Sequence, residues 1–142
     1  MKMTYKVYPV GKIHNNEDVR IEIYPQYLNG LLGIEQFSHI LVLYWLHEND
    51  DPQLRNTLQV HPCGNDANPL TGVFATHSPR RPNLIAISKC RLLEVNGSSL
   101  KIDRIDAFQG SPVIDIKAFF PDDDPPSCLL YTSDAADEVV PV

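Results

Sequence analysis

The chain has no long apolar run and few cysteines, and both absences restrict what the protein can be. The longest apolar run, residues 40–46, is far shorter than the roughly 20 residues that cross a bilayer, and no basic head followed by an apolar run opens the sequence. Before residue 128 only Cys63 and Cys90 occur, without CxxC spacing. Reduced thiols packed in a cytoplasmic protein explain them better than a disulfide scaffold. We therefore expect a soluble, cytoplasmic protein without a membrane partner.

The C-terminal end differs in character from the rest of the chain. The run CLLYTSDAADE, which begins at Cys128, matches one reading frame of a transposon-end adapter used in preparing DNA for sequencing. The preceding PDDDPPS is charged and rich in proline, as are many segments that leave an ordered domain. We expect one domain over residues 1–127 and a non-native, disordered tail over residues 128–142. Without that tail the chain has 12 basic and 15 acidic residues, a net charge of −3.

Short strand patterns dominate the sequence, and helical patterns are scarce. Strands are predicted over residues 5–13, 19–23, 40–46, 57–60, 72–75, 84–93, 100–105 and 112–119. The Asn96-Gly97 pair predicts a hairpin, because both residues tolerate a positive φ. Only residues 27–32 and 51–55 favour helices, the second with Pro52 at its first position. With no internal repeat and no heptad, the pattern indicates a mainly β single domain, either a barrel or a sandwich.

The segment GVFATHSPRRPN, residues 72–83, is the most informative part of the chain. An apolar half-strand runs into Arg80 and Arg81, which lie between Pro79 and Pro82. Each proline fixes its own φ and restricts the residue before it, so the two arginines are presented from a stiff loop. A core gains nothing from such a layout. We therefore expect this loop to hold an anionic or polar group.

Three motifs in order carry a family resemblance. They are GIEQFSHILVLYWLHE at residues 33–48, GVFATHSPRRPNLIAIS at 72–88 and DRIDAFQGSPVIDIKAF at 103–119. With them the chain resembles the TrmO family, also called the TsaA-like family. The resemblance implies a compact β-barrel with one or two short helices that forms a homodimer and binds S-adenosylmethionine. It also implies an enzyme that methylates N6 of threonylcarbamoyl-adenosine at tRNA position 37, so tRNA is the expected partner.

The same resemblance assigns the site residues. The implied cofactor-binding residues are His47, Glu48, His77, Asp103, Arg104, Ile105 and Asp106. Arg80, Arg81 and Asn83 are expected to hold the substrate, and Asp106, or His47 through water, is expected to take the proton from the amine. His77 stands where relatives carry arginine, which makes capture of a carboxylate weaker and dependent on pH. Asp115 and Lys117, two residues apart on a predicted strand, are expected to form a structural pair instead.

Simpler interpretations compete with these assignments. His47 and Glu48 can be an ordinary strand end, Arg81 a surface ion-pair partner, and Asp106 a turn cap. The relatives' N-terminal loop that closes over the cofactor has no counterpart between residues 13 and 31, and we expect the chain to lack their small C-terminal domain. These departures favour an alternative function, a non-catalytic module that binds a nucleoside or S-adenosylmethionine.

A metal-dependent hydrolase is the weaker alternative. It would need His39, His47, His61 and Cys63 to share a metal ion, although the sequence shows no second ligand pair at the usual spacing. We therefore expect no metal.

Overall fold

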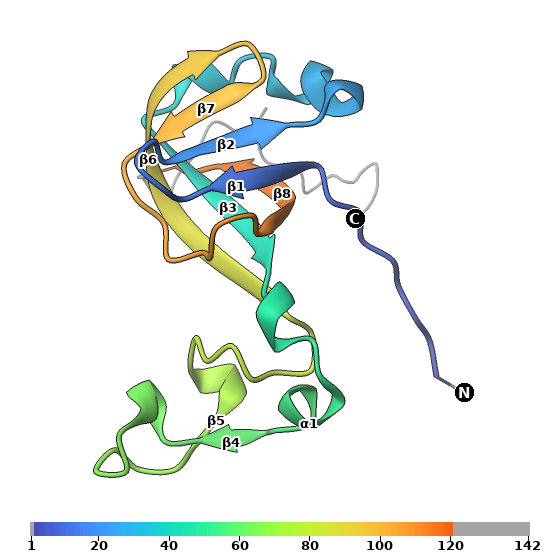
Figure 1. The fold of residues 1–142 in the computed structure, drawn as a ribbon, viewed down its shortest axis with the longest axis vertical. Coiled ribbons are helices and arrows are strands. Elements are labelled where there is room, and N and C mark those ends of the chain that lie inside the picture. The colour runs from blue at the N-terminus through green and yellow to red at the C-terminus, as the bar shows by residue number, and fades with distance from the viewer. Residues whose placement is uncertain (1, 121–142) are drawn as a thin grey trace.

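The computed structural model describes residues 2–120, so the predicted tail at residues 128–142 lies outside the described part of the chain. Six of its strands are β1 (Gly11–His14), β2 (Arg20–Ile23), β3 (His39–Trp45), β6 (Ile85–Asn96), β7 (Ser99–Ile102) and β8 (Pro112–Ala118). They follow one another in space as β1-β2-β7-β6-β3-β8, and every neighbouring pair is antiparallel. Because β1 also pairs with β8, the six strands form a closed ring (Figure 1).

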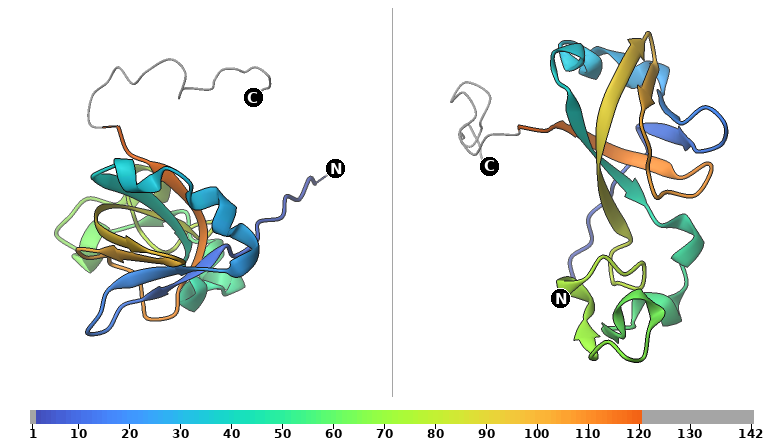
Figure 2. Two further views of the ribbon diagram at one scale, coloured as in Figure 1. Left: turned by 90° about the horizontal axis from the view of Figure 1, so that it is seen from above. Right: turned by 90° about the vertical axis from the view of Figure 1, so that its left-hand side faces the viewer.

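A small lobe, residues 47–83, leaves the ring between β3 and β6. It contains the 3₁₀ turns η3 (His47–Asn49), η4 (Pro62–Gly64) and η5 (Val73–Ala75), the helix α1 (Pro52–Arg55), and the short paired strands β4 (Gln59–Val60) and β5 (Thr71–Gly72). The views of Figure 2 show this lobe at one end of the ring. At the other end η1 (Pro25–Leu31) and η2 (Ile34–Gln36) connect β2 to β3 (Figure 1).

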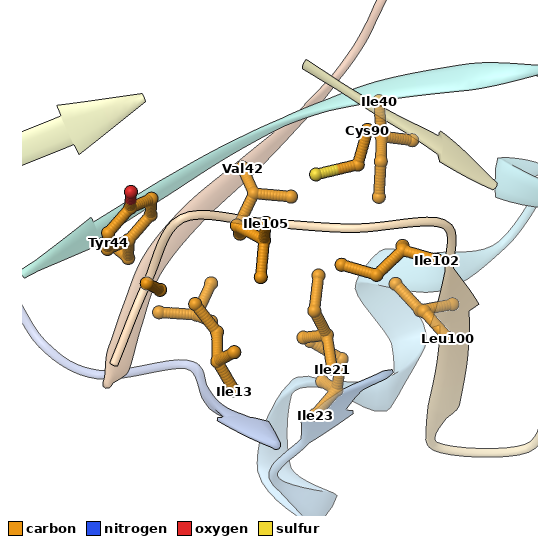
Figure 3. Close-up of a cluster of buried hydrophobic side chains, with 12 residues drawn as sticks. Ile13, Ile21, Ile23, Ile40, Val42, Tyr44, Cys90, Leu100, Ile102 and Ile105 are labelled. Atoms are coloured by element: carbon orange, nitrogen blue, oxygen red, sulfur yellow. The ribbon is translucent and has the colours of Figure 1, made fainter. Parts of the chain in front are cut away.

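The core fills the inside of the ring. Alternate strand residues point inward, as the two-residue period of a strand requires. On β3 these are Ile40, Val42 and Tyr44, and they pack with Ile13, Ile21, Ile23, Cys90, Leu100, Ile102, Ile105, Ala107 and Val113 (Figure 3). Tyr44 lies at one side of this cluster (Figure 3).

The β-rich prediction is confirmed, and so are most of its strands. The hairpin forms between β6 and β7, with Gly97 at φ 62° and Asn96 paired with Ser99. The helix at residues 51–55 forms as α1, where the Asp51 carboxylate accepts bonds from the N–H groups of Gln53 and Leu54. The predicted pair of Asp115 and Lys117 is present at 3.9 Å.

Three predicted segments differ from the structure. Residues 5–10 are extended and mostly exposed but belong to no strand. Residues 73–75 form a 3₁₀ turn instead of a strand, because the Thr76 N–H and hydroxyl both donate to the Val73 carbonyl. Strand β7 ends at Ile102, because Asp103 turns back to bond Arg91. Residues 25–31 form a 3₁₀ helix, consistent with glycines that oppose a longer α-helix.

None of the helices between residues 2 and 120 has the length and apolar character needed to span a lipid bilayer.

Candidate functional site

A cleft of about 540 Å³ lies where the ring meets the lobe, and we call it the first cleft. Its lining residues come from four stretches: the end of β3 with the turn after it (44–49), the segment 74–81, the start of β6 (85–88), and the loop 106–111. Strand β3 is antiparallel to β6, with Trp45 opposite Ile85, so the residues just after β3 lie beside those that precede β6. The pairing brings the first two sequence motifs together.

Three hydroxyl groups line the cleft together. Tyr44 and Ser111 are nearly fully buried, and the Ser88 hydroxyl lies 3.4 Å from the Tyr44 hydroxyl. The Ser111 hydroxyl donates to the Phe108 carbonyl at 2.7 Å, which fixes one end of the 106–111 loop. Motif reasoning did not identify these hydroxyls. The alternation of the apolar run in β3 could have placed Tyr44 on the inner face.

Arg81 is the best-anchored side chain of the cleft. One guanidinium nitrogen donates to the Thr76 carbonyl at 3.2 Å and to the Ser78 carbonyl at 2.8 Å. These bonds brace the segment that precedes the arginines. The remaining donors of this fixed guanidinium stay available, since Arg81 lines the cleft and belongs to no salt bridge within residues 2–120. The expected stiff presentation of Arg81 is therefore present.

Arg55 stabilises the same loop from the lobe. Its side chain donates to the Pro82 carbonyl at 2.9 Å and pairs with Asp50 at 3.0 Å, and its guanidinium lies 5.7 Å from the centre of the Trp45 ring. Helix α1 thus ties the arginine loop to the end of β3. No sequence signal pointed to this role, because it depends on a contact between residues far apart in the chain.

Two histidines and one glutamate also line the first cleft. His47 Nε2 lies 3.8 Å from a Glu48 carboxylate oxygen, directly after β3. His77 lies in the segment that forms a wall of the cleft. His47 and Glu48 are therefore part of the cleft lining, in addition to ending a strand.

Asp106 reaches the cleft on a loop that Asn15 holds. The Asn15 amide nitrogen donates to the carbonyls of Ile105 and Ala107, the residues on either side of Asp106, at 3.0 and 2.6 Å. The Asn15 backbone N–H donates to the Gln109 side chain. Asp106 itself is exposed and lines the cleft, and its carboxylate accepts no hydrogen bond within the described residues. The turn-cap interpretation of Asp106 thus finds no support in these bonds.

Five of the expected site residues, Arg80 among them, lie outside the first cleft. Ile105 is in the core, and Asn83, Asp103 and Arg104 do not line the cleft. Partial desolvation raises the pKa of Asp103, but hydrogen bonds from the amides of Arg91 and Arg104 outweigh it and hold that pKa below its ordinary value. Asp103 therefore has a structural role between β6 and β7.

A second cleft of about 830 Å³ adjoins the first, and segment 76–79 lines both. Arg80 lines this second cleft, whereas Arg81 lines the first. The Arg80 side chain has no hydrogen bond or salt bridge within residues 2–120. The two adjacent arginines therefore serve different clefts.

The histidines and the cysteine of the hydrolase alternative are separated. His39 begins β3 and contacts Ser38 and Phe119, while His47 lies just past the other end of this strand. His61 bonds the Asn68 carbonyl in the second cleft. Within the part of the chain that the structure describes, no three His, Cys, Asp or Glu side chains are grouped so that they could hold a metal ion.

Comparison with known proteins agrees with the motifs. The family model of the tRNA-methyltransferase O N-terminal domain matches residues 7–125. A probable S-adenosyl-L-methionine-binding protein of Pyrococcus horikoshii is 45% identical over 115 residues, which are 81% of this chain and 82% of that protein. The tRNA (adenine(37)-N6)-methyltransferase of Rattus norvegicus is 38% identical over 111 residues, which are 78% of this chain but 25% of the rat protein.

Solved structures agree as well. The crystal structure of TrmO from Pseudomonas aeruginosa matches with a TM-score of 0.65 and 27% identity, over 88% of this chain and 60% of that one. The chain thus spans less than two thirds of the solved structure that it resembles.

Proposed function

The chain belongs to the family of tRNA-methyltransferase O N-terminal domains, and we propose that its first cleft binds S-adenosylmethionine for methyl transfer to N6 of adenosine 37 in tRNA. The finer proposal is that this adenosine carries the threonylcarbamoyl group. The observation that carries the proposal is one cleft that gathers Arg81, His47, Glu48, His77 and Asp106 from three separate motifs. A volume of about 540 Å³ suits a ligand of this size.

The charges of the cleft fit the cofactor. S-adenosylmethionine carries a carboxylate, an ammonium and a cationic sulfur. Arg81, braced by two carbonyls, offers donors for the carboxylate, with His77 beside it in the same wall. Glu48 and Asp106 offer negative charge for the ammonium and the sulfur. Both signs of charge are thus available in one cleft.

The chemistry needs mainly positioning. When bound, S-adenosylmethionine supplies a methyl group on a cationic sulfur, and its transfer to an amine nitrogen releases one proton. Asp106 is the proposed acceptor of that proton, because its carboxylate is free of hydrogen bonds within the described residues and lines the cleft. His47, through water, is the second candidate for this role. Arg81 and the bracing of its loop hold the reactants in place.

The tRNA is proposed to approach over the second cleft. Arg80 lines that cleft without a partner among residues 2–120, so it can contact a phosphate of the nucleotides next to the target. Asn83, between the arginine loop and β6, remains a proposed substrate contact outside the first cleft. A tRNA substrate would also place the protein in the cytoplasm.

A homodimer is part of the same proposal. The outer face of β3 and β6 carries Leu41, Leu43, Trp45, Ile85 and Ile87. They alternate with the inward residues, and Ile85 and Ile87 are 41% and 47% exposed. A second copy of the chain would cover the part of this apolar face that lies outside the first cleft, which Ile85 and Ile87 border. Light scattering at several protein concentrations tests it, and a monomer at all of them would contradict the dimer.

The function is tested by binding and turnover on the same protein. S-adenosylmethionine should bind in calorimetry, and Asp106→Asn should slow methyl transfer to tRNA by about a hundredfold or more, the range of a lost proton acceptor. Lys101→Ala, on β7, is the control variant, since Lys101 lines neither cleft. Transcripts with and without the threonylcarbamoyl group test the finer substrate. Binding without methyl transfer would assign the non-catalytic module instead, and absence of binding would contradict both.

A further inference from the structure

Four consecutive residues at the start of β6, residues 85–88, all line the first cleft. Successive side chains of a strand point to opposite faces of the sheet, so one face cannot supply all four. Consecutive strand residues do share the backbone edge. The first cleft therefore opens onto the edge of β6.

Hydrogen bonds at the two ends of the β3–β6 ladder show which backbone groups this edge presents. The Leu92 N–H donates to the Ser38 carbonyl, and the Leu46 N–H donates to the Leu84 carbonyl, both at 2.8 Å. The register between these two bonds is continuous. Since alternate residues of an antiparallel strand bond to the same neighbour, the even-numbered residues over 84–92 bond to β3. The odd-numbered residues over 85–91 direct their N–H and C=O groups to the other edge.

Strand β7 leaves the first half of that edge open. It pairs with β6 only over residues 92–96. The Arg91 N–H donates to the Asp103 carboxylate at 2.9 Å, and the Arg91 carbonyl accepts from the Asp103 N–H at 3.2 Å. The Ile85 N–H donates to the Asn83 carbonyl. Within residues 2–120, the N–H and C=O groups of Ile87 and Lys89 have no partner.

We propose that the backbone of Ile87 recognises the adenine ring of the ligand in the first cleft. The Ile87 N–H donates to adenine N1, and the Ile87 C=O accepts from the 6-amino group. Adenine presents an acceptor beside a donor along this edge, which complements the donor and acceptor that one strand residue directs to one side. Of the two open residues, Ile87 lines the cleft and Lys89 does not.

The surroundings of Ile87 suit a flat aromatic ligand. Ile85, Ile87 and Phe108 all line the first cleft and are 41%, 47% and 61% exposed. Such side chains offer apolar surface to the faces of a purine ring while the backbone contacts its edge. This inference rests on the proposed function and adds to it the means by which adenine is distinguished from other bases.

Amide hydrogen exchange tests the open edge within one strand. In the free protein, the amides of Ile87 and Lys89 should exchange quickly, while those of Ala86 and Ser88, bonded to β3, should be protected. Saturating S-adenosylhomocysteine should protect Ile87 by at least about tenfold and leave Lys89 unchanged, so Lys89 is the matched control. Protection of Ile87 in the free protein would overturn the inference, since another strand, such as one from a second copy, would then cover the edge.

A ligand analogue tests the chemistry. In S-inosylhomocysteine the 6-amino group becomes a carbonyl and N1 gains a proton. The Ile87 N–H would then face another N–H, and the Ile87 C=O would face another carbonyl, so neither hydrogen bond can form. Its affinity should be at least about tenfold lower than that of S-adenosylhomocysteine. Equal affinities, or an unprotected Ile87 in the complex, would overturn the inference while the cofactor site stands. If S-adenosylhomocysteine itself does not bind, the cofactor site and the inference both fail.

Discussion

Asn15 should control the cleft through the loop that carries Asp106. In Asn15→Ala, the carbonyls of Ile105 and Ala107 lose the side-chain amide that now holds them at 3.0 and 2.6 Å. Each such bond contributes about 0.5–1.5 kcal/mol, so the free energy of unfolding should fall by about 1–3 kcal/mol. At roughly 4 °C per kcal/mol for a domain of this size, the melting temperature should fall by about 4–12 °C.

The same substitution should weaken ligand binding, because the loosened loop supplies Asp106 and its neighbours to the first cleft. Urea unfolding measures the stability, and calorimetry with S-adenosylhomocysteine measures the affinity. Asn16→Ala is the matched control, since Asn16 only accepts an exposed bond from the Asp18 N–H at 3.3 Å. A stability loss with unchanged affinity would refute the claim that Asn15 positions the cleft. An unchanged free energy of unfolding would contradict the stabilising role of the two Asn15 hydrogen bonds.

Three more single residues have testable roles. Arg80→Ala should weaken binding of an anticodon stem-loop and lower by about 1 the slope of the logarithm of the binding constant against the logarithm of the salt concentration. Lys101→Ala should do neither, because Arg80 lines the second cleft whereas Lys101 lines neither cleft. Iodoacetamide at pH 8 should alkylate exposed Cys63 but leave Cys90 unmodified until the protein unfolds, as peptide mass spectrometry would show, because burial raises the pKa of Cys90 to about 12. Asp103, with its lowered pKa, should stabilise the fold above about pH 4 and lose that contribution as the pH falls through the lowered value, so the stability difference from Asp103→Asn should shrink in acid.

The strands were predictable because most of them carry local signals. The apolar run of β3 and the Asn96-Gly97 turn depend on neighbouring residues alone, and both formed as expected. The strand prediction for residues 73–75 was wrong. The Thr76 hydroxyl donates to the Val73 carbonyl, and this bond favours a turn over an extended strand. Such competition between a side chain and the ladder leaves little trace in an apolar pattern.

The motifs named residues that line one cleft, but they did not name the residues that hold this cleft in place. His47, Glu48, His77, Arg81 and Asp106 were named from the resemblance, and the structure brings them to one cleft.

Asn15 and Arg55 were missed, since each acts on carbonyl groups, those of Ile105 and Ala107 and that of Pro82, far away in the sequence. A sequence motif identifies the side chains that are expected to face a ligand. It does not identify the distant residues that hold those side chains in place.

The position of the cleft results from how the ring is paired. Strand β6 pairs with β3 along its first half and with β7 only along its second half, so its first half has one open edge. The lobe leaves the ring at the end of β3 and returns at the start of β6, which are paired at Trp45 and Ile85. Residues on both sides of the lobe, such as His47 and Arg81, are therefore held beside that open edge by the β3–β6 ladder. Changes in the middle of the lobe, away from its two attachment points, should leave this arrangement of the first cleft in place.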